Sequence, residues 1–282
     1  MTADLILLNG QIETMDAARP RATALAVRGG RVIALGDDAT IRAHAGHGTR
    51  QVDAGGRLVL PGFQDTHIHL HSGGVDLATA AQLFDATSLE QLLEVLAAHA
   101  AAMRDLPLVI GVGWNPALFG EGNLTCHVID RVVSDRPAIL YDSSFHSACL
   151  NSHAMAMIGL ERGAEDPFNG HFVTDGSGAP TGMLYEEAVG YAVKRLPRLT
   201  RAQDILGVRQ GQALANRHGI TGIVDPSVTG REAAAYATLA EEGALTLRVG
   251  GAARVAAGDS TAATCDRLEA LRRSHSGPDF RI

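Results

Sequence analysis

The residues of this chain best suited to chemistry are two histidines at alternate positions, His67 and His69. They follow the apolar run Leu58–Leu60 and a Pro-Gly pair, and we expect this whole segment to form a strand. Residues two apart on a strand point to the same side, so both imidazoles would face one point where the strand ends. Two neutral imidazoles can bind one divalent metal ion. The spacing therefore predicts a metal site.

Neighbouring residues extend this predicted site. Asp65 lies on the same expected face as the two histidines and could orient one of them, because a metal-bound imidazole usually donates its other ring N–H to an acceptor. His71 lies past the expected strand end and could face solvent or substrate. The exit Ser72–Gly74 is typical of a flexible loop. For an isolated His-x-His pair, a polar strand face or a core histidine is the alternative interpretation.

Composition indicates a globular protein. Of the 282 residues, 46% are hydrophobic and 20% are charged, which allows a large core and argues against disorder. The net charge of −7 and the scattered arginines provide no basic patch, so we expect no nucleic-acid partner. Three distant cysteines without C-x-x-C spacing predict reduced thiols. They are Cys126, Cys149 and Cys265.

The sequence shows no targeting or membrane segment. Residues 1–10 lack a basic flank and are too short an apolar run for a signal peptide, and no later stretch approaches a membrane span. We therefore expect a cytoplasmic protein without membrane association.

The order of expected elements divides the chain in two. Residues 1–57 contain β-rich stretches, two of them joined by Gly29-Gly30, and we expect them to form the N-terminal part of a small β-sandwich domain. Strands and helices alternate over residues 58–282, in about five βα units, with a glycine-rich hairpin inserted at residues 170–181. A closed (β/α)8 TIM barrel has eight strands. The predicted class is α/β with an incomplete barrel; a complete smaller α/β domain is the alternative.

Residues 61–69, with the pattern Pro-Gly-Phe-x-Asp-x-His-x-His, resemble the first barrel strand of the amidohydrolase superfamily. Residues 113–115, 140–154, 175–186 and 218–225 resemble the YtcJ-like amidohydrolases, so the resemblance spans essentially the whole chain. It implies a barrel of the metal-dependent hydrolase type in which His67 and His69 are the first two metal ligands. The chain departs from the family at Phe145-His146, where members often have Gly-His, and this change could reshape the pocket.

Four residues near predicted strand ends are further candidates, each with a structural alternative. Trp114 and His146 could bind substrate, although Trp114 could equally anchor the core and His146 could cap or pack. Glu186 could be a third metal ligand, or a glutamate favoured at the start of a helix by the helix dipole. Asp225 could orient a metal ligand or form a turn before Pro226.

The resemblance implies a hydrolase acting on carbon–nitrogen bonds other than peptide bonds, with a small amide or cyclic amide as substrate. A divalent metal, with zinc as the first expectation, would activate water and polarise the substrate carbonyl. In the family, the general acid/base is an aspartate at the end of the last barrel strand, and further histidines come from intermediate strands. None of these lies within the present residues, so we expect the catalytic aspartate beyond Ile282.

Other interpretations stay open. The chain could belong to a deaminase of the same superfamily, or it could be a non-catalytic half-barrel that binds a partner chain. As an enzyme, it could be the first part of a longer polypeptide, or it could pair with a complementary C-terminal chain or with a second copy of itself. The raw edge of an incomplete parallel sheet favours such pairing.

Overall fold

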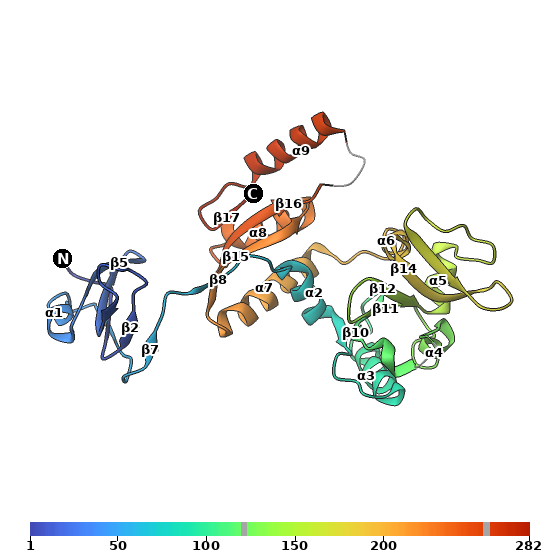
Figure 1. Ribbon diagram of the computed structural model, residues 1–282, viewed down its shortest axis with the longest axis horizontal. Helices are drawn as coiled ribbons and strands as arrows, with labels where there is room; N and C mark the ends of the chain where they lie inside the picture. The colour runs from blue at the N-terminus through green and yellow to red at the C-terminus, as the bar shows by residue number, and fades with distance from the viewer. Residues whose placement is uncertain (120–122, 256–259) are drawn as a thin grey trace. The chain divides into compact units, whose positions relative to one another are not determined.

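The computed structural model describes residues 1–119, 123–255 and 260–282, and the chain divides into two compact units, Met1–Gln64 and Asp65–Ile282 (Figure 1). The division falls after Gln64 and not after residue 57 as expected. The reason is that Leu58–Val59 pairs in parallel with Gln11–Ile12 and so belongs to the first unit.

The first unit is built from short strands in two sheets. One sheet has the order β5-β4-β1-β6 and the other has the order β3-β2-β7. The elements are β1 (Leu5–Leu8), β2 (Gln11–Glu13), β3 (Arg21–Ala22), β4 (Ala24–Arg28), β5 (Arg31–Gly36), α1 (Asp38–Arg42), β6 (Arg50–Asp53) and β7 (Leu58–Val59). The predicted hairpin between β4 and β5 is present, and its turn needs Gly29 and Gly30 because both have positive φ.

The second unit contains a six-stranded sheet of order β13-β14-β12-β11-β10-β9. β9, β10 and β11 are parallel, whereas β12, β14 and β13 are antiparallel. The predicted hairpin near residues 170–181 is formed by β13 and β14. The strands are β9 (Ala80–Gln82), β10 (Val109–Trp114), β11 (Ala138–Asp142), β12 (Ser147–Leu150), β13 (Gly170–Thr174) and β14 (Pro180–Glu186).

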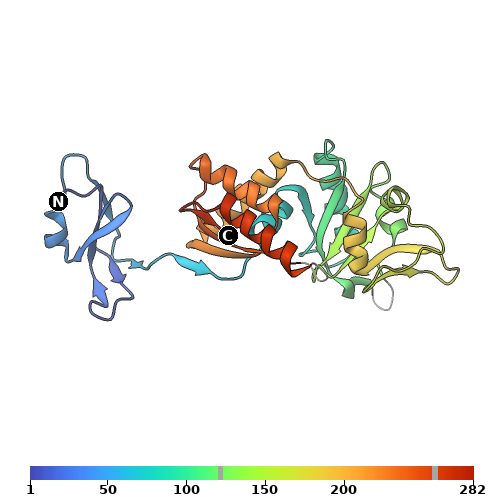
Figure 2. The same cartoon turned by 90° about the horizontal axis from the view of Figure 1, so that it is seen from above.

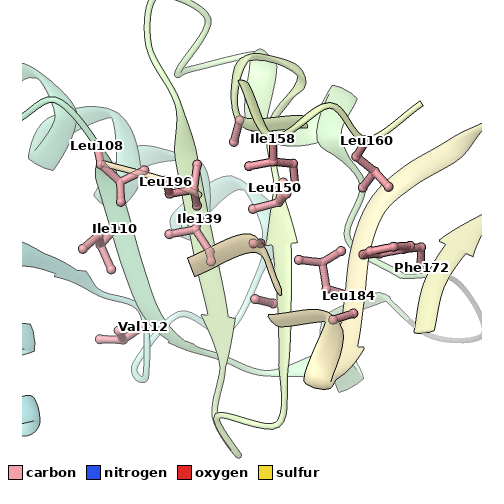
Figure 3. Packing of buried hydrophobic residues seen from close by; sticks show 14 of the residues in the cluster. Leu108, Ile110, Val112, Ile139, Leu150, Ile158, Leu160, Phe172, Leu184 and Leu196 are labelled. Atoms are coloured by element: carbon pink, nitrogen blue, oxygen red, sulfur yellow. The ribbon is translucent and has the colours of Figure 1, made fainter. Parts of the chain in front are cut away.

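Helices cover both faces of this sheet. Every residue of β10 is buried, as expected for a strand enclosed on two sides. One face packs on α5 and α6 through the cluster drawn in Figure 3, which includes Ile110, Ile139 and Leu184. The other face packs on α3 and α4 through Leu92, Leu96 and Ile129. The helices are α3 (Leu89–Ala102), η1 (Pro116–Phe119), α4 (Cys126–Asp130), α5 (Ser152–Ile158) and α6 (Glu187–Val193).

A second sheet has the order β17-β16-β15-β8. Its strands lie side by side in their sequence order, although β9–β14 separate β8 from β15 in the chain. Strands β15, β16 and β17 are parallel, and helix α8 lies against this sheet (Figure 2). Tyr236 and Leu239 of α8 belong to the hydrophobic core between them. Asp65, the last residue of β8, opens the second unit. The elements are β8 (Phe63–Asp65), α2 (Leu70–Thr79), α7 (Arg201–Arg217), β15 (Ile220–Val228), α8 (Gly230–Glu241), β16 (Arg248–Ala253), α9 (Thr261–Ser274) and β17 (Phe280–Arg281).

The expected single series of about five βα units is therefore wrong in one respect. Its strands are divided between two sheets, and β9–β14 form a sheet inserted between α2 and α7. Hydrophobic periodicity reports the type of an element but not its partner. In the described ranges both sheets are open, with no strand closing a barrel. Among the helices described, none has the length and apolar character to cross a bilayer.

Helices α2 and α7 pack so closely that their backbones are in contact. A Cβ on Gly74 would lie 2.1 Å from the carbonyl oxygen of Gly207, and a Cβ on Gly211 would lie 2.8 Å from the carbonyl oxygen of Leu70. Only glycine permits such an approach. Because α2 begins directly after His69, this contact fixes the position of the predicted metal ligand.

A comparison of two adjacent glycines tests this packing. Gly74→Ala should lower the free energy of unfolding by about 2 kcal/mol or more, because the new methyl group meets backbone that cannot move aside. Gly73→Ala, on the exposed side of the same helix with open space around it, should raise stability by up to about 1 kcal/mol. Urea unfolding measures both, and equal stability of the two variants would contradict the close contact.

Candidate metal centre

The two predicted ligands lie just past the end of strand β8. The strand ends at Asp65, His67 lies in a bend, and His69 is the residue that caps the N-terminus of α2. Strand alternation is therefore not what aligns them, contrary to the sequence argument. Their rings nevertheless meet edge to face, with centroids 5.5 Å apart and planes at 88°.

Backbone hydrogen bonds position this segment. The N–H of Ile68, between the two histidines, donates to the carbonyl of Val224 at 3.1 Å. The Asp65 carboxylate accepts from the N–H of His67 at 3.0 Å. Both imidazoles stay accessible, and the His69 side chain is 54% exposed. The described contact of Asp65 is thus to the backbone of His67; orientation of a ring by Asp65 stays a prediction.

Asp225 brings a buried carboxylate next to His69. Its Oδ1 lies 4.0 Å from the Nδ1 of His69, and its side chain is only 3% exposed. The Tyr236 hydroxyl donates to Oδ2 at 2.8 Å, and the Ser227 N–H donates to Oδ1 at 3.2 Å. Burial, with the nearby charge of Asp225, raises the pKa of Tyr236, so its phenol keeps the proton that it donates. The carboxylate is therefore held in one orientation beside His69.

His71 does not face solvent or substrate as the sequence suggested. It lies in the first turn of α2, is 5% exposed, and its Nε2 lies 3.2 Å from Oδ1 of Asp204 on α7. Its Nδ1 lies 3.9 Å from Glu232 on α8. The expectation failed because α2 starts immediately after His69 and turns the next residues toward α7. His71 thus joins three helices.

Arg231 completes this polar cluster from its exposed side, with a side chain that is 41% exposed. Its Nε and Nη2 donate to the two carboxylate oxygens of Asp204 at 2.8 and 2.6 Å. These hydrogen bonds raise the pKa of Arg231. Burial acts to raise the pKa of Glu232, but hydrogen bonds from Thr229 outweigh it and hold that pKa below its ordinary value. These side-chain contacts hold α2, which begins directly after His69, against α7 and α8.

His146 and Glu186 lie together at one end of β12 and β14. Nδ1 of His146 is 3.2 Å from Oε2 of Glu186, and both side chains are more than half exposed. The Glu186 N–H also donates to the His146 carbonyl at 2.9 Å. No hydrogen bond or ion pair among the described residues joins Glu186 to His67 or His69. A metal-ligand role for Glu186 and substrate binding by His146 stay predictions.

Trp114 is buried in the six-stranded sheet. The indole N–H donates to the Leu140 carbonyl at 3.3 Å, and the ring packs edge-on against Phe119, with centroids 5.5 Å apart. The side chain has no exposed surface. This placement fits the core-anchoring alternative that the sequence left open.

A different set of metal-type side chains lies on α4. Ligand atoms of Cys126, His127 and Asp130 all lie within 4.8 Å of one another. Burial raises the pKa of the Cys126 thiol, which disfavours the thiolate that a metal needs. The Asp130 carboxylate is already engaged by the N–H and hydroxyl of Ser152. The group is therefore better explained as structural.

The sequence analysis missed Tyr236, Asp204 and Arg231. All three lie on helices, away from any recognisable motif, and their roles depend on packing between helices far apart in the chain. The available signal was limited to Thr229 and Glu232, whose spacing forms the capping box that starts α8.

The buried cluster should contribute strongly to stability. Asp204→Ala should lower the free energy of unfolding by about 3 kcal/mol, because it leaves His71 and Arg231 without their shared carboxylate. Glu242→Ala, at the residue that follows α8, removes the exposed partner of Arg209 on α7. This change should lower the free energy of unfolding by less than about 1 kcal/mol. Urea unfolding measures both; similar losses would show that burial of the cluster has no special effect.

Comparison with known proteins identifies the family. The model described as "Amidohydrolase family" matches residues 50–281. The N-substituted formamide deformylase of Arthrobacter pascens is 30% identical over 248 residues, which cover 83% of this chain and 44% of that protein. The putative amidohydrolase YtcJ of Bacillus subtilis is 30% identical over 194 residues, which cover 68% and 36%.

A solved structure shares the fold. The crystal structure of an uncharacterized metal-dependent hydrolase from Pyrococcus furiosus superposes with a TM-score of 0.72 at 24% identity, over 99% of this chain and 55% of that one. The present chain thus spans about half the length of that protein, and less than half of the two curated relatives. With a family match over most of its residues, the chain belongs to the amidohydrolase family.

Proposed function

We propose that this chain provides the first part of the metal centre of a hydrolase that cleaves the carbon–nitrogen bond of an amide or cyclic amide. The observation that carries the proposal is the pair of accessible imidazoles, His67 and His69, meeting beside the fixed carboxylate of Asp225. Similarity to a formamide deformylase supports an amide as the substrate class.

The residues present fit a divalent cation. Imidazole nitrogen is a common ligand of zinc and of several other divalent metals, and both rings are open to solvent. Asp225 lies on the Nδ1 side of His69, so it would accept the Nδ1 proton and leave Nε2 free for the metal. Zinc is the metal that we propose.

Each residue then has a defined task. His67 and His69 would hold the ion, which when bound would supply Lewis acidity and an activated water. Asp225 orients the His69 ring, and Tyr236 fixes Asp225 through the buried hydrogen bond. Asp65 and Val224 fix the backbone on which the histidines stand. The remaining ligands and the proton-transferring aspartate would come from residues beyond Ile282.

Metal binding and hydrolysis test this assignment together. The test uses the native polypeptide or complex that supplies the remaining ligands and the aspartate. In it, His67→Ala and His69→Ala should each weaken zinc binding about a hundredfold or more and reduce formate release from an N-alkylformamide to background. Zinc affinity is measured by competition with a chromophoric chelator, and formate is measured enzymatically. His47→Ala removes an exposed histidine of the first unit and should change neither quantity.

Three results would contradict parts of the proposal. Unchanged zinc affinity in both ligand variants would exclude His67 and His69 as the site. Zinc binding by that polypeptide or complex without hydrolysis of any amide would favour a non-catalytic role. Release of ammonia from an amino-substituted heterocycle, with none of formate from the formamide, would assign the deaminase chemistry instead.

A further inference from the structure

The second unit contains a cavity of about 280 Å³ that the metal centre does not use. Its lining comes from α2, from the β10 and β11 face of the six-stranded sheet, and from the segment that joins α6 to α7. Ile110 and Ile139 form apolar wall, and both belong to the cluster shown in Figure 3. Its size suits a small organic molecule.

One carboxylate faces this largely apolar space. Asp76 lies in the second turn of α2, and within the described ranges no side chain pairs with its carboxylate or donates a hydrogen bond to it. Burial raises the pKa of Asp76 to about 6, so the group is still mostly ionised at neutral pH. A desolvated charge without a counter-charge destabilises a fold, and such groups are commonly kept for binding.

An aromatic pair forms another wall of the cavity. The rings of Tyr141 and Phe145 stack, with centroids 6.1 Å apart and planes at 29°. Phe145 has φ of 61°, a left-handed conformation that is strained for a bulky side chain. It is also the position at which this chain has Phe145-His146 in place of the Gly-His that the family resemblance leads us to expect. Backbone strain often marks functional positions. At this half-exposed residue beside a cavity, it points to contact between the Phe145 ring and a ligand.

Two arginines also line the cavity, and neither is paired with Asp76. Arg231 is held by both oxygens of Asp204. Arg198 is exposed, and in the described part of the chain it has no ion pair. A solvated guanidinium at the rim needs no ligand, whereas the partly buried carboxylate does. The cavity therefore favours a cationic ligand over an anionic one.

We propose that this cavity binds an organic ammonium ion with an aromatic or apolar body. The ammonium group would donate to the Asp76 carboxylate and lie near the faces of the Tyr141 and Phe145 rings, which attract cations. The body of the ligand would pack against Ile110 and Ile139. The site needs neither the metal nor hydrolysis, so it stands apart from the proposed function.

Three probes of similar size and different charge test the site by calorimetry on the purified protein. They are 2-phenylethylammonium, 2-phenylethanol and phenylacetate. We expect saturable binding of the ammonium, with binding of the neutral alcohol and the anion at least tenfold weaker. Asp76→Asn keeps the shape of the side chain and should weaken ammonium binding about tenfold or more. Asp85→Asn, the same change at an exposed position, should alter it less than twofold.

Thermal unfolding without ligand separates binding from structure. Because Asp76→Asn removes an uncompensated charge, the variant should melt no lower than the parent protein. Three results would overturn the proposal: no saturable ammonium binding by the folded parent protein, equal affinity of parent and Asp76→Asn, or tighter binding of phenylacetate than of the ammonium. The last would assign the cavity to an anion held by Arg198.

Discussion

The contact between α2 and α7 is the constraint on which the second unit depends. Backbone meets backbone at Gly74 and Gly207, and beside this contact the buried side chains of His71 and Asp204 interact, with Arg231 bound to Asp204 from the more exposed side. Close packing and buried ion pairing each tolerate little displacement. Together they give α2 a single position relative to α7.

Two features follow from that fixed helix. His69 is the N-cap residue of α2, so the position of α2 sets the position of this proposed metal ligand. Asp76 lies in its second turn, so the charged group of the cavity does as well. β15 follows α7 in the chain and contributes both the Val224 carbonyl and the Asp225 carboxylate to the histidine segment. The proposed metal centre thus combines the start of α2 with the neighbouring strand β15, and the packing of α2 on α7 holds the first of these in place.

Sequence reasoning predicted the family and the turns better than the architecture. The family followed from the resemblance of short motifs, and the hairpins at Gly29-Gly30 and near residues 170–181 followed from turn chemistry. The boundary between the units and the division of strands into two sheets did not, because both depend on pairing between distant segments. Asp225 was a candidate because it follows the predicted strand of residues 220–224, although β15 continues past it to Val228. Tyr236 was not, since a tyrosine inside a helix gives no sign of the carboxylate it will contact.

The sheet of strands β9–β14 lies between α2 and α7 in the sequence, and this placement affects which part of the second unit can unfold locally. The two helices hold the ends of the inserted segment close together, so this segment behaves as a closed loop anchored at its base. Within the part of the chain that the structure describes, its six strands pair only with one another. Because no strand pairing among the described residues ties the inserted sheet to β8 or β15–β17, we expect that its strands can open locally while the contact between α2 and α7 stays intact.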